Sequence, residues 1–115
     1  MTKKLLCYNN SMKMTQEKVL AYLKELKSEL EAEGIEKVAL FGSFATHSQN
    51  VYSDIDIAIQ KKKNFLDEYT AYEYLNLLTK IKSKIMCRLH LPSDVFDLDS
   101  KSSFKKQIEK ELIYV

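Results

Sequence analysis

Two aspartates, Asp54 and Asp56, stand one residue apart inside an apolar run that ends at Ile59. On a β-strand, residues i and i+2 point to the same face, so the pattern predicts two carboxylates side by side, facing away from a core. Adjacent carboxylates repel each other unless a positive charge lies between them. Because carboxylate oxygens are the ligands that Mg²⁺ prefers, the pair indicates a divalent metal site.

A Gly42-Ser43 turn stands shortly before this pair and follows a short apolar run. If a helix begins at Ser43, the free backbone N–H groups of its first turn face an anion such as a phosphate. The alternatives are an ordinary turn between a strand and a helix, and a solvated strand face that carries two acids. The two motifs at this spacing favour a functional site over either alternative.

Hydrophobic periodicity predicts the elements that position these residues. Apolar residues at helical spacing predict a helix from the N-cap Thr15 to Gly34, and a last helix that Ser100 caps. Further helices are expected over 43–48 and 65–86, strands over 37–41, 53–60 and 93–98, and a tail or edge strand over 1–13. The order α-β-α-β-α-β-α predicts an α/β (α+β) fold, a small mixed sheet flanked by helices, in a single domain over 1–115.

The composition excludes several classes of protein. The 115 residues carry a net charge of +2, and Arg88 is the single arginine, so the sequence does not predict a specific nucleic-acid ligand. No apolar run is long enough for a membrane helix, and no secretory pattern is visible. Since Cys7 and Cys87 also lie far apart, we expect a reduced, cytoplasmic protein without a membrane partner.

The segment Gly42-Ser43-Phe44-Ala45, followed by Ser53-Asp54-Ile55-Asp56-Ile57, resembles the signature of the polymerase-β-like nucleotidyltransferase superfamily. The short length is similar to that of its minimal nucleotidyltransferases, the MNT group. The resemblance implies that a nucleoside triphosphate, ATP or another one, is held at Gly42, Ser43 and Ser53. It also implies that Asp54 and Asp56 bind two Mg²⁺ ions and act in catalysis.

The resemblance further implies a third catalytic and metal-binding carboxylate on the strand at 93–98. Asp94 fits best, because the family usually places this acid directly before an apolar pair, and Asp97 is the second choice. The two acids point to opposite faces of a regular strand, so only one of them can join the site. His47 departs from the family, which usually has a glycine there; the histidine either crowds the loop near the phosphates or faces solvent.

Family members with other acceptors carry an additional domain for them, and we expect no room for one in 115 residues. Solitary MNT proteins of bacteria often pair with a HEPN-domain RNase as antitoxins, and some add AMP to a tyrosine of it. The resemblance therefore implies a Mg-dependent nucleotidyltransferase that moves AMP from ATP to a hydroxyl of a HEPN-type toxin. The alternatives are an antitoxin that acts by contact alone, and transfer to a small molecule within a homo-oligomer.

Overall fold

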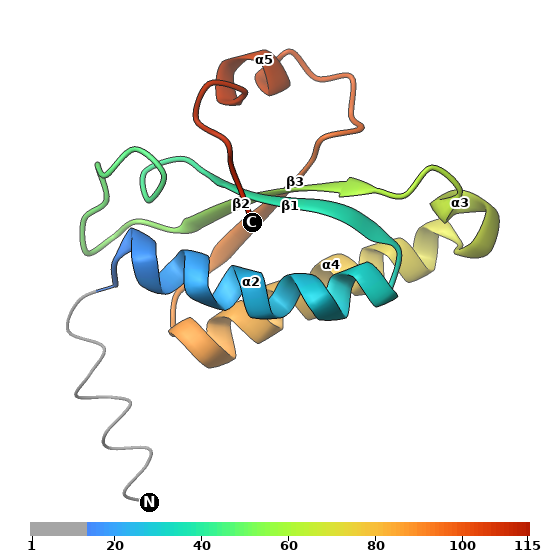
Figure 1. Ribbon diagram of the computed structural model, residues 1–115, viewed down its shortest axis with the longest axis horizontal. Coiled ribbons are helices and arrows are strands. Elements are labelled where there is room, and N and C mark those ends of the chain that lie inside the picture. The colour runs from blue at the N-terminus through green and yellow to red at the C-terminus, as the bar shows by residue number, and fades with distance from the viewer. Residues whose placement is uncertain (1–13) are drawn as a thin grey trace, which may run out of the picture.

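A four-stranded mixed sheet lies at the centre of the fold (Figure 1). The structure, a computed structural model, describes residues 14–115, so the expected tail or edge strand at 1–13 lies outside the described residues. The strands are β1 Ile35–Phe41, β2 Ile55–Lys61, β3 Ser93–Asp97 and β4 Ile113–Tyr114, in the spatial order β3-β2-β1-β4. β1 runs antiparallel to both β2 and β4, whereas β2 and β3 are parallel.

The two faces of the sheet are covered by different helices. Figure 1 shows α2 (Gln16–Ala32) and α4 (Ala71–Leu89) on one face, and the short α5 (Phe104–Ile108) on the other. The larger core lies under α2 and α4, and its fully buried side chains include Val19, Leu23, Ile55, Ile57, Ile59, Ile81 and Ile85. The smaller core lies on the α5 face and consists of Ala39, Phe41, Ala58, Leu98 and Ile108.

Alternation along β2 decides where the acids lie. Ile55, Ile57 and Ile59 are completely buried against the α2 and α4 face. Residues between them point the other way, so Asp56 shares the α5 face with the buried Ala58. The predicted separation of the isoleucines from the acids is therefore present in the structure.

The first helix agrees with its prediction, because α2 begins after Thr15 and the Thr15 hydroxyl accepts a hydrogen bond from the backbone N–H of Lys18 at 3.2 Å. The expected helix over 65–86 is wrong as a single element. It is divided into α3 (Phe65–Glu68) and α4, since Thr70 and Glu73 form a capping box that begins a new helix.

The C-terminal region also differs from its prediction. The last helix is not capped by Ser100; it begins at Phe104, spans five residues, and is followed by the short strand β4. A turn over residues 43–47 stands in place of the helix expected over 43–48. The order of the elements therefore differs from the predicted order. The predicted fold class, a mixed sheet flanked by helices, is confirmed. No helix among residues 14–115 has both the length and the hydropathy needed to cross a bilayer.

Candidate functional site

Asp56 and Asp94 are register partners on the neighbouring parallel strands β2 and β3. Asp54 directly precedes β2, and two-residue spacing places it on the same face as Asp56. Asp54 and Asp94 are exposed, whereas Asp56 is half-buried. Burial raises the pKa of Asp56 to about 6, with further contributions from the negative charges of Asp94, Asp54 and Glu111. The structure thus brings the three predicted acids to one end of the sheet, with Asp56 at the centre of their charge.

Gly42 directly follows β1 and lies against the Asp56 carboxylate. Its φ of +77° is in the left-handed region that glycine adopts without strain. A Cβ atom at Gly42 would overlap the Asp56 carboxylate, lying 2.9 Å from its Cγ atom. The glycine is therefore required both by the turn and by the close approach of the acid.

The turn after Gly42 offers hydrogen-bond donors, although it is not the predicted helix. The carbonyl of Gly42 accepts hydrogen bonds from the N–H groups of Ala45 and Thr46, at 3.0 and 3.1 Å, and the carbonyl of Ser43 accepts one from Ser48 at 2.9 Å. Within residues 14–115, the N–H groups of Ser43 and Phe44 and the Ser43 hydroxyl make no hydrogen bond. These donors are available for an anion beside the acids.

Glu111 is a site residue that the sequence reasoning missed. Its Oε1 atom accepts a hydrogen bond from the Gly42 N–H at 2.9 Å, across 69 positions of sequence. The periodicity assigned this part of the chain to a helix, and no local pattern marks Glu111 as a partner of the Gly-Ser turn. The Gly42 N–H is therefore already hydrogen-bonded to a carboxylate. The charge of that carboxylate adds to the negative charge around Asp56.

Two further residues of the loop have defined places. The Ser53 hydroxyl oxygen accepts a hydrogen bond from the Asn50 N–H at 2.9 Å, so Ser53 braces the loop before Asp54. His47 has a φ of +60° and is exposed. Glycine adopts this left-handed conformation without strain, which explains why the family that the signature resembles usually has a glycine there. The histidine side chain is exposed to solvent and does not fill the loop.

Asp97 lies on the other face of β3 and is already bonded. It accepts hydrogen bonds from Lys61 Nζ at 2.5 Å and from the Tyr74 hydroxyl at 2.6 Å. Burial acts to raise the pKa of Asp97, but the hydrogen bonds from Lys61 and Tyr74 outweigh it and lower the value. The geometry therefore favours Asp94 over Asp97 as the third acid of the site.

The donor set at this end of the sheet suits Mg²⁺ in kind, because it consists of carboxylates whose mutual repulsion a cation would relieve. Within the described residues, however, no three acids, histidines or cysteines are grouped closely enough to hold an ion. Coordination would require the exposed side chains of Asp54 and Asp94 to rotate toward Asp56. Both have the solvent exposure to do so.

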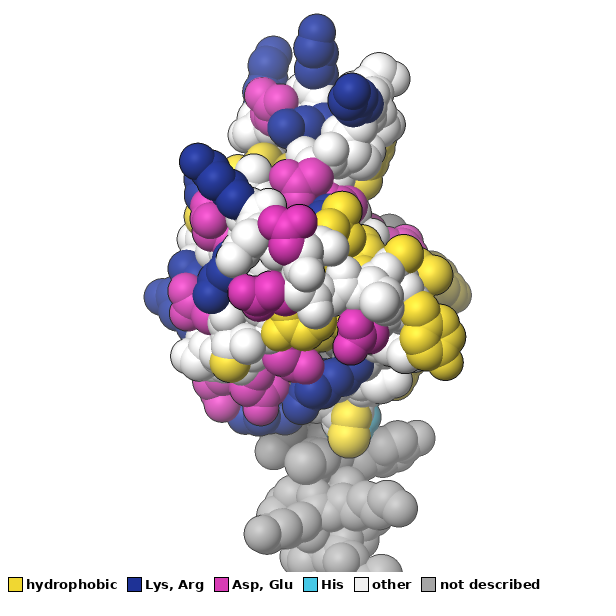
Figure 2. All heavy atoms as spheres, turned by 90° about the vertical axis from the view of Figure 1, so that its right-hand side faces the viewer, with side chains coloured by type: hydrophobic (Ala, Val, Ile, Leu, Met, Phe, Trp, Pro, Cys, Tyr) yellow, Lys and Arg dark blue, Asp and Glu magenta, His cyan; other side chains and the backbone are white. Residues whose placement is uncertain are grey.

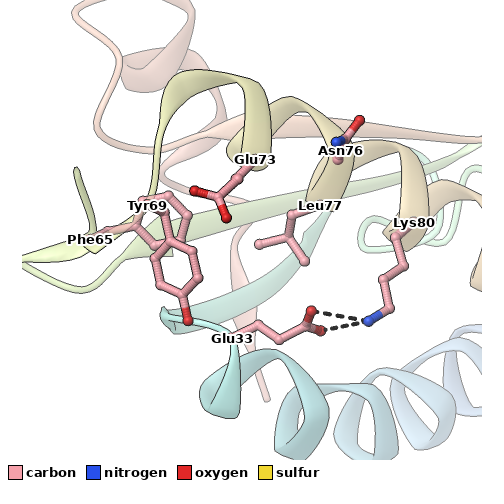
Figure 3. Close-up of a pocket in the computed structure, with 7 residues that line it drawn as sticks. All are labelled: Glu33, Phe65, Tyr69, Glu73, Asn76, Leu77 and Lys80. Atoms are coloured by element: carbon pink, nitrogen blue, oxygen red, sulfur yellow. Dashed lines mark hydrogen bonds and ion pairs between the residues drawn. The ribbon is translucent and has the colours of Figure 1, made fainter. Parts of the chain in front are cut away.

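A cavity of about 230 Å³ lies at the other end of the sheet (Figure 3). Its walls come from the end of α2, α3 and the first half of α4, and Glu33 and Lys80 form an ion pair at 3.0 Å across it. In the β1–β2 register this end is marked by the pair Ile35 and Lys61, whereas Asp56 pairs with Phe41 at the opposite end. The cavity is therefore separate from the acids.

Comparisons with known proteins agree with this geometry. The family model described as "Polymerase beta, Nucleotidyltransferase" matches residues 24–115. Two proteins of Methanocaldococcus jannaschii, each named "Putative protein adenylyltransferase", are 34% identical over 86 residues and 30% identical over 83 residues. Both alignments cover 70% of this chain, and they cover 77% and 76% of the relatives.

A solved structure described as "Crystal structure of the toxin-antitoxin with AMP-PNP" contains a chain with the same fold. The superposition has a TM-score of 0.56 at 24% sequence identity, and covers 79% of this chain and 69% of the other.

Proposed function

Because this chain belongs to the polymerase β nucleotidyltransferase family, we propose that it moves AMP from ATP to a hydroxyl group of a partner protein. We propose further that this partner is the toxin of a toxin–antitoxin pair, of the HEPN type that the sequence signature implies. The observation that carries the proposal is the register pair Asp56–Asp94 beside the Gly42-Ser43 turn, where carboxylates and hydrogen-bond donors lie at one end of the sheet.

The relatives support the finer parts of this proposal. The names of the two Methanocaldococcus jannaschii relatives describe transfer of an adenylyl group to protein. The solved structure with the same fold is a toxin–antitoxin with AMP-PNP, an analogue of ATP. Together these names favour ATP as the donor and a toxin protein as the acceptor.

The residues of the turn would bind the triphosphate. The free N–H groups of Ser43 and Phe44 and the Ser43 hydroxyl would donate hydrogen bonds to phosphate oxygens, as backbone donors in such turns do. Asp54, Asp56 and Asp94 would hold two Mg²⁺ ions, which supply charge neutralisation for the triphosphate and the leaving pyrophosphate. Ser53 would keep the loop in place through its hydrogen bond with Asn50.

In the transfer step, the acceptor oxygen forms a bond to the α-phosphorus of ATP, and the bond from that phosphorus to the bridging oxygen of pyrophosphate breaks. The proton of the acceptor hydroxyl passes to a carboxylate of the site. Asp94 is suited to accept it, because its carboxylate is exposed and lies on the strand next to Asp56. The products are an AMP ester of the acceptor and pyrophosphate.

The experiment is a transfer assay with the purified protein, α-³²P-ATP, Mg²⁺ and the product of the neighbouring gene, read by gel and by intact mass. We expect the mass of one or more AMP groups on the partner with wild type and no transfer with Asp54→Asn. The control variant is Asp67→Asn, an exposed acid on α3 that lies away from the site and should transfer AMP normally.

The contact-only antitoxin predicts a different result. In that case the Asp54→Asn variant neutralises the toxicity of the partner as well as wild type does, and no AMP mass appears on the partner. A stable complex without transfer would therefore overturn the enzymatic proposal and leave the binding function.

A further inference from the structure

The loop before Asp54 presents two apolar side chains to solvent. Val51 is 84% exposed and Tyr52 is 90% exposed, although both are large hydrophobic residues. We call these two residues the Val51–Tyr52 tip. Isolated exposed apolar residues are common on protein surfaces, so exposure alone does not assign a function to the tip.

The tip is held in place by hydrogen bonds within its own loop. Asn50 Oδ1 accepts a hydrogen bond from the Tyr52 N–H at 2.8 Å, and the Asn50 carbonyl accepts one from the Ser53 N–H at 3.0 Å. The Ser53 hydroxyl accepts a third from the Asn50 N–H at 2.9 Å. These bonds fix the turn and leave the two side chains pointing outward, so binding a partner through them costs little backbone entropy.

The chain segment that leads up to the tip carries no formal charge, and Asp54 is the first charged residue after it. No lysine, arginine, aspartate or glutamate occurs from Val38 to Ser53, whereas 30% of the whole chain is charged. Figure 2 shows the opposite end of the molecule, near α3, where acidic and basic side chains are interspersed over the surface. Centres of protein–protein interfaces are depleted in charged residues and enriched in tyrosine. The absence of basic residues from this segment, and the acids that follow it, favour a protein over a nucleic acid or an anionic membrane as the partner.

The tip also lies where an acceptor protein must arrive. Tyr52 precedes Asp54 by two residues, and Figure 1 shows this loop at the end of the sheet opposite α3. The cavity described above lies at the α3 end, away from the acids. An acceptor protein that reaches the acids from this end of the sheet would pass close to Val51 and Tyr52, which lie just before Asp54.

We propose that the Val51–Tyr52 tip is the docking contact for the acceptor protein, and that it enters an uncharged apolar recess beside the hydroxyl that receives AMP. This inference rests on the proposed function for the identity of the occupant. Tyr52 provides the larger contact area, with its ring as an anchor and its hydroxyl able to hydrogen-bond at the rim. Val51 extends the apolar contact.

The test compares wild type with the double variant Val51→Ser, Tyr52→Ser, using the product of the neighbouring gene as the acceptor. We expect the KM for the acceptor in AMP transfer, and its Kd in titration calorimetry, to rise at least tenfold. The Kd for ATP with Mg²⁺ and the melting temperature should not change, because both side chains are almost fully exposed and belong to neither core. The matched control is Tyr72→Ser on α4, which is 73% exposed at the far end and should behave as wild type.

Three results would overturn the inference. Unchanged acceptor binding in the double variant would remove the tip from the interface. Weaker ATP binding with intact acceptor binding would show that Tyr52 stacks on the nucleotide base. Conversion of a wild-type dimer to a monomer would show that the tip joins two copies of this chain. If wild type binds the partner without transferring AMP and the double variant does not bind, the enzymatic proposal fails while the docking surface stands.

Discussion

The Glu111 carboxylate accepts a hydrogen bond from the Gly42 N–H at 2.9 Å, and so a residue near the C-terminal end of the chain is fixed to the turn that precedes the acids. The contact is positioned by β4, in which Ile113 pairs with Leu40 of β1. It places a negative charge where the proposed function requires the phosphates of a nucleotide to approach. Binding of a triphosphate therefore has to overcome repulsion from Glu111 or displace it from Gly42.

The first prediction follows from this repulsion. Replacing Glu111 with glutamine keeps an oxygen that can accept from Gly42 but removes the charge, so we expect the Kd for ATP with Mg²⁺ to fall about fivefold, which corresponds to roughly 1 kcal/mol for a partly exposed charge. Titration calorimetry measures the change. Glu109→Gln, at an exposed position in the same segment, serves as the control. Weaker binding in Glu111→Gln would mean that Glu111 helps to hold the metal ions.

The second prediction concerns the backbone at Gly42. Because its φ is +77° and a Cβ there would overlap the Asp56 carboxylate, Gly42→Ala should lower the free energy of unfolding by about 1–3 kcal/mol. Urea unfolding gives this value, and Ser43→Ala should differ from wild type by less than about 0.5 kcal/mol. If Gly42→Ala is as stable as wild type, the turn does not need a left-handed residue at this position.

Much of the candidate site could be predicted because its geometry is local. The two-residue period of a strand places Asp54 and Asp56 on one face, and the same rule separates Asp94 from Asp97. Glu111 could not be found in this way. It reaches Gly42 through a strand of only two residues, and so short a pairing leaves no periodic pattern in the sequence.

The two wrong helix predictions, over 43–48 and over 65–86, have equally specific causes. Residues 43–48 do not form a helix because His47 takes a left-handed φ of +60° after a single turn, and Ser48 then bonds to the Ser43 carbonyl at 2.9 Å. The predicted helix over 65–86 continued through Thr70, although Thr70 and Glu73 have the spacing of a capping box. Apolar spacing alone concealed this break, since exposed Leu66 satisfied the helical pattern without belonging to the core.

The third prediction tests the break before α4. The Thr70 hydroxyl accepts a hydrogen bond from the Glu73 N–H at 3.1 Å, and the Glu73 carboxylate accepts one from the Thr70 N–H at 2.9 Å. Thr70→Ala removes the first bond and should lower the free energy of unfolding by about 1 kcal/mol, whereas Thr70→Ser should retain most of it. Urea unfolding of the three proteins provides the comparison. Equal stability of the alanine and serine variants would show that the cap does not determine where α4 begins.

The fourth prediction separates the structural acid Asp97 from the proposed catalytic acid Asp94. Asp97 accepts hydrogen bonds from Lys61 and Tyr74, so Asp97→Asn should lower the free energy of unfolding by about 2 kcal/mol at pH 7. Asp94 is exposed and has no such partners among the described residues, so Asp94→Asn should remain as stable as wild type and lose AMP transfer. The transfer assay with each variant, at a temperature well below melting, checks the division.

The pH dependence of Asp97 provides an independent test of the same assignment. Its pKa is lowered in the folded protein from the ordinary value of 3.8, so its stabilising contribution is present above about pH 4 and is lost as the pH falls through the folded value. The difference in free energy of unfolding between wild type and Asp97→Asn should therefore be largest at neutral pH and shrink below pH 4. Urea unfolding from pH 2.5 to pH 7 measures it, with Asp67→Asn as a surface control. A difference that stays constant with pH, together with loss of transfer in a stable Asp97→Asn protein, would place Asp97 in the site and remove Asp94 from it.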